Sequence, residues 1–237
     1  MPLSDWLRGR RSGPARRVRQ ALTLSRDGDV TAAVEMIAER FPEALDELRA
    51  LGEAVDAGWL RLATALEFRS GRMLEGHATA ERALAIDEDP QTWHLLGRLR
   101  TWLGRADATD AFRRAALMDP AEFFLPYRVT RQQFAALAEQ AFTAIPAQFR
   151  DRLDNTLVVV DDLPELDAVR EGEDPDVLGV YDGATAMDRG LPERIVLYQR
   201  NHEQVAANVT ELTEEVNQTM RHEIGHHFGM EEDELPY

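Results

Sequence analysis

Residues 222–233 read His-Glu-Ile-Gly-His-His-Phe-Gly-Met-Glu-Glu-Asp and hold three of the six histidines in the chain. On an α-helix, residues four positions apart lie on the same face, one turn above the other. His222 and His226 could therefore direct both imidazoles at one metal ion. Glu223 flanks that face, where its carboxylate could accept a proton from metal-bound water. This is the H-E-x-x-H pattern of zinc hydrolases, so we expect Zn²⁺ as the cofactor.

A catalytic zinc site normally has three protein ligands, so a third must come from outside this helix. Only eight residues follow Gly229 in this sequence, which leads us to expect that ligand directly after the glycine. A glycine can adopt the left-handed conformation that turns a chain back after a helix. In the pattern H-E-x-x-H-x-x-G-x-x-H the ligand follows the second histidine by six residues, where this chain has Glu232. We expect Glu232 as the third ligand, with Asp233 as the alternative.

The helix that carries the histidines is expected to begin after Asn208. Glu211 follows three residues later, and the pair resembles a capping box. His227 points about 100° away from His226 around the helix, so we expect it to pack or to support the site rather than bind the metal. Apolar residues recur every four positions and predict a buried stripe: Leu212, Val216, Met220, Ile224 and Phe228.

The chain contains no cysteine and has a formal net charge of -16. Disulfides and thiolate zinc sites are therefore excluded, and we expect a cytoplasmic protein. Residues 151–237 contain 22 acids and 6 arginines, whereas residues 1–150 contain 21 of each. The acidic half carries the metal motif, which argues against a nucleic-acid substrate because phosphate binding needs clustered cations. No apolar run has the length of a membrane span, and residues 1–15 are expected to form a basic arm.

Residues 16–120 are expected to be helical and to repeat with a period of about 34 residues. Trp59 and Trp93 begin similar segments, and the turn glycines Gly71 and Gly104 have nearly the same spacing. A helix-turn-helix unit with an early tryptophan, alanines in its second helix and a closing Asp-Pro resembles a tetratricopeptide repeat. The two tryptophans are expected to pack between helices.

An earlier, degenerate copy around residues 18–33 is expected to cap the two clear repeats, and residues 43–54 are expected to form an additional helix. Such units bury their apolar faces only by stacking on one another. The repeats could present a concave surface to a peptide or a protein partner. A plain helical scaffold is the alternative.

After residue 120 the pattern predicts a helix at about 130–142 and buried strands at 157–160 and 194–198, with a short strand at 178–181. Strands followed by a late metal helix indicate a small α+β domain. The fold class is therefore α+β overall, with an all-α repeat domain at 16–120 and an α+β domain at 121–237.

Several short segments of residues 125–237 match a known family. They are Ile145-Pro146, Phe149-Arg150, Val158 to Asp162, Gly179-Val180-Tyr181, Arg194 to Tyr198 and His222 to Gly229. Together they resemble the bacterial minimal zincin-like metallopeptidase family. The resemblance implies a compact core in which a sheet packs on the metal helix, and a neutral peptidase activity. By matching positions, it implies that His222 and His226 are ligands and Glu223 is the base, with Glu232 or Asp233 at the family's acidic position.

These patterns favour a zinc-dependent peptidase in which Glu223 is the general base and the repeats recruit a substrate or a partner. The strand at 194–198 is expected to be an edge that pairs with an extended peptide. Tyr181 or Tyr198 could donate a hydrogen bond to the developing oxyanion.

Two other functions stay open. The first is a non-catalytic binding module with a structural or regulatory zinc site, closed by both histidines together with Glu232 and Asp233. The second is a metallohydrolase that acts on a non-peptide amide.

Overall fold

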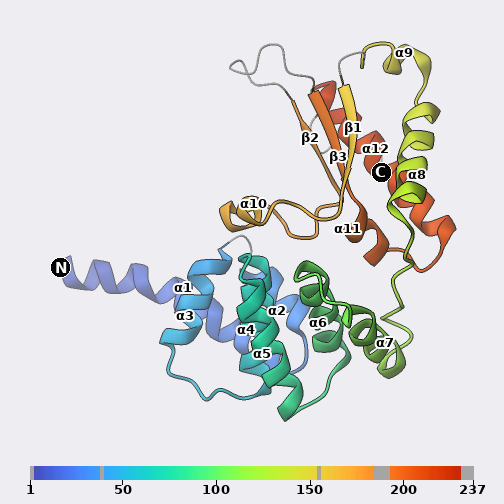
Figure 1. Ribbon diagram of the computed structural model, residues 1–237. Helices are drawn as coiled ribbons and strands as arrows, with labels where there is room; N and C mark the ends of the chain where they lie inside the picture. The colour runs from blue at the N-terminus through green and yellow to red at the C-terminus, as the bar shows by residue number, and fades with distance from the viewer. Residues whose placement is uncertain (1–2, 38–39, 154–155, 184–192, 231–237) are drawn as a thin grey trace. The chain divides into compact units, whose positions relative to one another are not determined.

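The computed structural model describes residues 3–37, 40–153, 156–183 and 193–230, with side chains from residue 15 onward. The chain divides into two compact units. The first unit comprises Met1–Phe124 and Glu165–Pro175, and the second comprises Leu125–Pro164 and Asp176–Tyr237. The described residues are mostly helical, with one three-stranded sheet towards the C-terminus (Figure 1). The predicted α+β class with a helical N-terminal region is confirmed.

The described part of the first unit is helical, and the N-terminal caps of α4 and α6 are both aspartates. The Asp56 side chain accepts a hydrogen bond from Trp59 N at 2.8 Å, and Asp89 accepts one from Thr92 N at 3.0 Å. Such side-chain caps satisfy amides that have no partner within the helix. The helices are α1 (Leu3–Arg26), α2 (Val30–Ile37), α3 (Phe41–Ala50), α4 (Ala57–Arg69), α5 (Met73–Ile86), α6 (Pro90–Trp102), α7 (Ala108–Met118) and α10 (Leu166–Glu171).

Two clusters of buried side chains form the core of the first unit. One joins α1 to α4 through leucines such as Leu22, Leu45 and Leu66. The other joins α4 to α7 and includes Phe68 and Leu99. Trp59 and Trp93 pack against these clusters, as predicted. Helix α3 ends at residue 50, four residues earlier than predicted, and Gly52 follows with a φ of 65°. The tetratricopeptide-like character of these helices stays a prediction.

The second unit places its helices against a three-stranded sheet of order β1-β3-β2. Strand β1 (Thr156–Asp161) runs parallel to β3 (Glu193–Tyr198), with Val159 opposite Val196. Strand β2 (Gly179–Asp182) runs antiparallel to β3, with Val180 opposite Val196. The prediction that 194–198 is an edge strand is therefore wrong. Its continuous apolar run suits a central strand, since residues 195–198 are all buried.

The described edges of this sheet are β1 and β2. The predicted strand at 157–160 is present as β1, but it is only half-buried, with Leu157 51% exposed, so the prediction that it is buried is wrong. An edge strand has a neighbour on one side only, which leaves more of its surface in contact with water.

Helices α8 (Arg131–Ala144) and α12 (Val209–His227) lie side by side against the sheet (Figure 1). Helix α8 contacts β1, and α12 contacts β2 and β3. Thr130 caps α8 in a capping box with Gln133, close to the predicted start. The short helices α9 (Ala147–Arg150) and α11 (Gln199–Gln204) complete the unit. The predicted stripe of α12 is buried from Leu212 to Ile224 and packs in the same cluster as Ile195, Leu197 and Phe134.

Candidate metal centre

Local signals define both ends of α12. At its start, the Asn208 side chain accepts hydrogen bonds from Thr210 N at 3.0 Å and Glu211 N at 3.1 Å. Glu211 in turn accepts one from Ala207 N at 2.7 Å. The predicted capped start is confirmed. A cap of this kind typically contributes about 1 kcal/mol to helix stability.

The helix ends in the glycine turn that the sequence predicts. Gly229 has a φ of 73°, in the left-handed region. Its amide donates to His226 O at 2.9 Å, and Met230 N donates to Gly225 O at 3.1 Å. These two bonds form a Schellman motif, which reverses the chain after a helix. The helix therefore ends at a left-handed glycine three residues after His226.

His222 and His226 lie together on one face of α12. Their Nε2 atoms are 3.1 Å apart. The two rings are packed edge to face, with 4.7 Å between their centroids. Two nitrogens that bind one tetrahedral zinc ion at about 2.0–2.1 Å would be about 3.3–3.4 Å apart. The donor pair therefore fits a zinc ion with a small adjustment of the two rings.

Glu223 projects from the next position on α12 and is 5% exposed. It lines a cavity of about 260 Å³ together with His222, Thr219 and Gly179. A Cβ atom on Gly179 would lie 2.8 Å from Thr219 Cγ2 and 3.0 Å from Val196 O. Glycine thus lets β2 approach α12 closely, so the cavity has the start of an edge strand on one side and the histidine helix on the other.

The two predicted acidic ligands, Glu232 and Asp233, lie outside the described residues. Up to Met230, the described part of the chain contains no group of three or more His, Cys, Asp or Glu residues that could hold a metal ion. The described donors are therefore the two imidazoles, and a third ligand from residues 232–233 stays a prediction.

His227 points towards the sheet. Its Nδ1 atom lies 2.8 Å from Glu193 Oε2 and 3.2 Å from the hydroxyl of Tyr181. Burial, together with the neighbouring Glu193, raises the pKa of Tyr181 to about 12. The tyrosine hydroxyl thus stays protonated and is engaged with His227. Tyr198, the other candidate oxyanion donor, is 7% exposed at the end of β3.

A buried carboxylate on α11 was not anticipated from the sequence. Glu203 is 0% exposed. It accepts hydrogen bonds from Arg128 Nη1 at 2.7 Å, Arg200 Nη1 at 2.9 Å, Gln199 Nε2 at 2.8 Å and Val129 N at 3.0 Å. Burial by itself raises the pKa of Glu203, but these donors outweigh it and the pKa is lowered. Glu203 therefore stays ionised and joins α11 to the segment before α8.

A buried histidine links α11 to α12. His202 Nδ1 lies 3.0 Å from Tyr198 O, and its Nε2 lies 3.1 Å from Thr219 Oγ1. Burial lowers the pKa of His202 to about 4, so the ring is neutral at pH 7. Thr219 lies one turn before Glu223 and lines the same cavity. The pattern offered no signal for this contact, because an isolated histidine and threonine show no recognisable spacing.

Comparison with protein families agrees with this geometry. Residues 153–237 match the family model described as zincin-like metallopeptidase. The match contains the three described strands and the whole of α12, so this part of the chain is similar to zincin-like metallopeptidases. No curated protein matches the chain. Among the described residues, no helix is both long and apolar enough to cross a membrane.

Proposed function

We propose that this chain is a zinc-dependent peptidase whose centre lies on α12. The observation that supports it most is the pair of Nε2 atoms 3.1 Å apart on His222 and His226, with buried Glu223 beside them in a region similar to zincin-like metallopeptidases. The two histidines would hold the ion, with Glu232 or Asp233 as the third ligand. The helical unit would recruit the substrate or a partner, and we place the protein in the cytoplasm.

The chemistry divides between the metal and the chain. When bound, zinc lowers the pKa of a coordinated water and polarises the scissile carbonyl. Glu223 accepts the proton of the attacking water and returns it to the leaving amine. The cavity at Glu223 is lined by residues of β2 and α12, so the water and the reacting carbonyl would be held between the edge strand and the helix.

The edge strand supports a peptide as the substrate. Strand β2, and not β3, is the edge next to the cavity among the described strands. An extended peptide can add to such an edge by backbone hydrogen bonds. Val177, Leu178 and Gly179 line the cavity at the start of this strand, so a peptide paired there would pass Glu223.

The decisive experiment measures metal content by mass spectrometry and cleavage of a peptide library. We expect one zinc per chain in the wild type, and cleavage lost with zinc retained in Glu223→Gln. Glu214→Gln is the matched control, because Glu214 is exposed on the same helix, and it should cleave like the wild type. Absence of bound metal, or undiminished cleavage by Glu223→Gln, contradicts the proposal. Stoichiometric zinc without cleavage in any of the proteins would favour the binding-module alternative.

A further inference from the structure

Residues 165–175 lie within the part of the chain that matches the peptidase family, yet they fold with the helical unit. Val169 is 1% exposed and belongs to the core cluster that contains Phe68. A Cβ atom on Gly71 would lie 2.9 Å from Arg170 Cγ and 3.5 Å from Val169 Cγ1. The segment is therefore packed into the helical unit at two places. One is the turn at Gly71, and the other is the set of apolar contacts around Val169, called the socket below.

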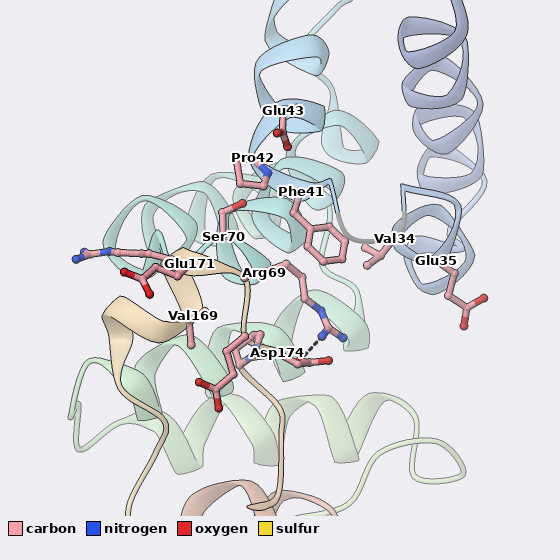
Figure 2. A pocket seen from close by; sticks show the side chains of 14 residues that line it. Val34, Glu35, Phe41, Pro42, Glu43, Arg69, Ser70, Val169, Glu171 and Asp174 are labelled. Carbon is pink, nitrogen blue, oxygen red and sulfur yellow. Dashed lines mark hydrogen bonds and ion pairs between the residues drawn. The ribbon is translucent and has the colours of Figure 1, made fainter. Parts of the chain in front are cut away.

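The segment is strongly acidic and binds to arginine. It contains five acids and one arginine. The carboxylate of Asp174 pairs with the guanidinium of Arg69 at the end of α4, as the dashed line in Figure 2 shows. Burial and then repulsion by Arg69 lower the pKa of Arg98 to about 9, whereas Asp174 acts in the opposite direction. Asp174 thus supplies negative charge to two neighbouring cations.

Open space remains beside the segment. A cavity of about 780 Å³ is lined on one side by α2, α3 and the end of α4, and on the other by residues 169–175. In Figure 2, Phe41 and Arg69 lie on the helical side, with Val169 and Asp174 on the segment. The cleft already holds one acidic stretch of chain and has room for part of another. A second peptide could therefore enter before the first one leaves.

We propose that residues 165–175 are a resident ligand of the helical unit, and that a partner or substrate protein displaces them with a segment of its own that carries an aliphatic residue and an aspartate at the same spacing. The displacing segment would place a branched aliphatic residue in the socket of Val169 and, five positions later, an aspartate on Arg69. Arginine suits this role because its planar group pairs well with carboxylates. The inference deepens the recruiting role proposed for the helices, but it does not depend on hydrolysis.

The test is a binding titration with the full-length chain carrying Glu223→Gln, so that no cleavage can occur. The probe is a labelled peptide with the sequence of residues 165–176. A tethered segment competes at an effective concentration of about millimolar, so the parent protein should bind the probe weakly. Asp174→Arg adds a third cation next to Arg69 and Arg98. The repulsion among the three should release the resident segment. We expect the probe to bind this variant about tenfold or more tightly than the parent.

Two further variants separate this mechanism from a general loss of structure. Asp167→Arg makes the same charge change in the same segment, but the Asp167 side chain is 86% exposed and pairs with nearby Arg170 on the same helix. It should bind the probe like the parent. Adding Arg69→Glu to Asp174→Arg restores an ion pair, and it should return amide hydrogen exchange in 165–175 to the parent rate and abolish probe binding.

The outcomes are decisive in both directions. Faster exchange in 165–175 and tighter probe binding for Asp174→Arg alone support the proposal. The proposal is overturned if Asp174→Arg and Asp167→Arg have the same probe affinity and the same hydrogen exchange. It is also overturned if adding Arg69→Glu to Asp174→Arg does not change the affinity for the probe. Neither readout measures cleavage. The peptidase proposal and the displacement proposal can therefore be contradicted independently of each other.

Discussion

Helices α11 and α12 of the second unit each carry a glutamate that water hardly reaches, and the two carboxylates have different surroundings. Glu203 on α11 is 0% exposed and is held by two arginines and further donors. Glu223 on α12 is 5% exposed and lines a cavity that it shares with His222. The two glutamates are almost equally buried, so burial alone does not tell a structural carboxylate from a catalytic one. The Glu203 carboxylate is held by cations that tie α11 to the segment before α8, whereas Glu223 shares its cavity with His222, as the proposed general base requires.

The largest expected effect tests the chemical side of this contrast. Glu223→Gln should lower kcat by about 10²–10⁴-fold, because a positioned general base typically contributes that much. Its free energy of unfolding should stay close to that of the wild type, since the glutamine has nearly the same volume. Kinetics on a cleaved peptide and urea denaturation measure the two quantities. A large loss of stability would show that Glu223, like Glu203, has a structural role.

The structural side is tested by Glu203→Gln. Removing this charge leaves Arg128 and Arg200 next to a neutral amide in a buried site. Breaking a buried ion pair in this way typically costs about 3–5 kcal/mol. We expect that loss in urea denaturation, whereas Glu139→Gln, an exposed change on α8, should stay within about 0.5 kcal/mol. A stable Glu203→Gln variant would show that the ion network is dispensable.

A pH titration extends the comparison to the contact between the two helices. The pKa of buried His202 is lowered to about 4, so the unfolded chain binds its proton at higher pH than the folded chain does. Its contribution to stability is therefore complete above the ordinary histidine pKa of about 6.5 and is lost as the pH falls from there towards 4. The loss should approach about 3 kcal/mol. His202→Gln should flatten the curve of unfolding free energy in this range, and an unchanged slope would contradict the assignment.

The features of α12 that could be predicted from sequence all depend on residues that are close together in the chain. The Asn208 cap, the stripe from Leu212 to Ile224 and the turn at Gly229 each depend on residues within a few positions of one another. The pairing of His222 with His226 follows from helical periodicity alone. All of these features appear in the structure, because helical geometry fixes them before any distant segment is considered.

The features that escaped prediction depend on distant pairings. The central position of β3 depends on β1 and β2 joining it from both sides, which no local pattern of 194–198 reveals. Glu203 meets Arg128 across 75 positions of sequence. The packing of 165–175 into the helical unit was equally invisible, since an acidic stretch with Pro and Gly has the composition of an ordinary loop.

The smallest expected effect concerns the turn that ends α12. Gly229 and Gly104 both have positive φ, 73° and 64°, and a Cβ atom on either would meet nothing within 4 Å. Alanine at either position should therefore cost about 1–2 kcal/mol of stability for the same conformational reason.

The two glycines differ in the segment to which each turn leads. Gly104 leads from α6 to α7, whereas Gly229 leads from His226 to the predicted third ligand at 232–233. Gly229→Ala should therefore also weaken zinc binding, while Gly104→Ala should leave it unchanged. Competition with a chelator measures this affinity for both proteins. If the two variants lose stability equally and bind zinc equally, the turn at Gly229 only ends a helix, and the third ligand does not depend on the path that the chain takes after it.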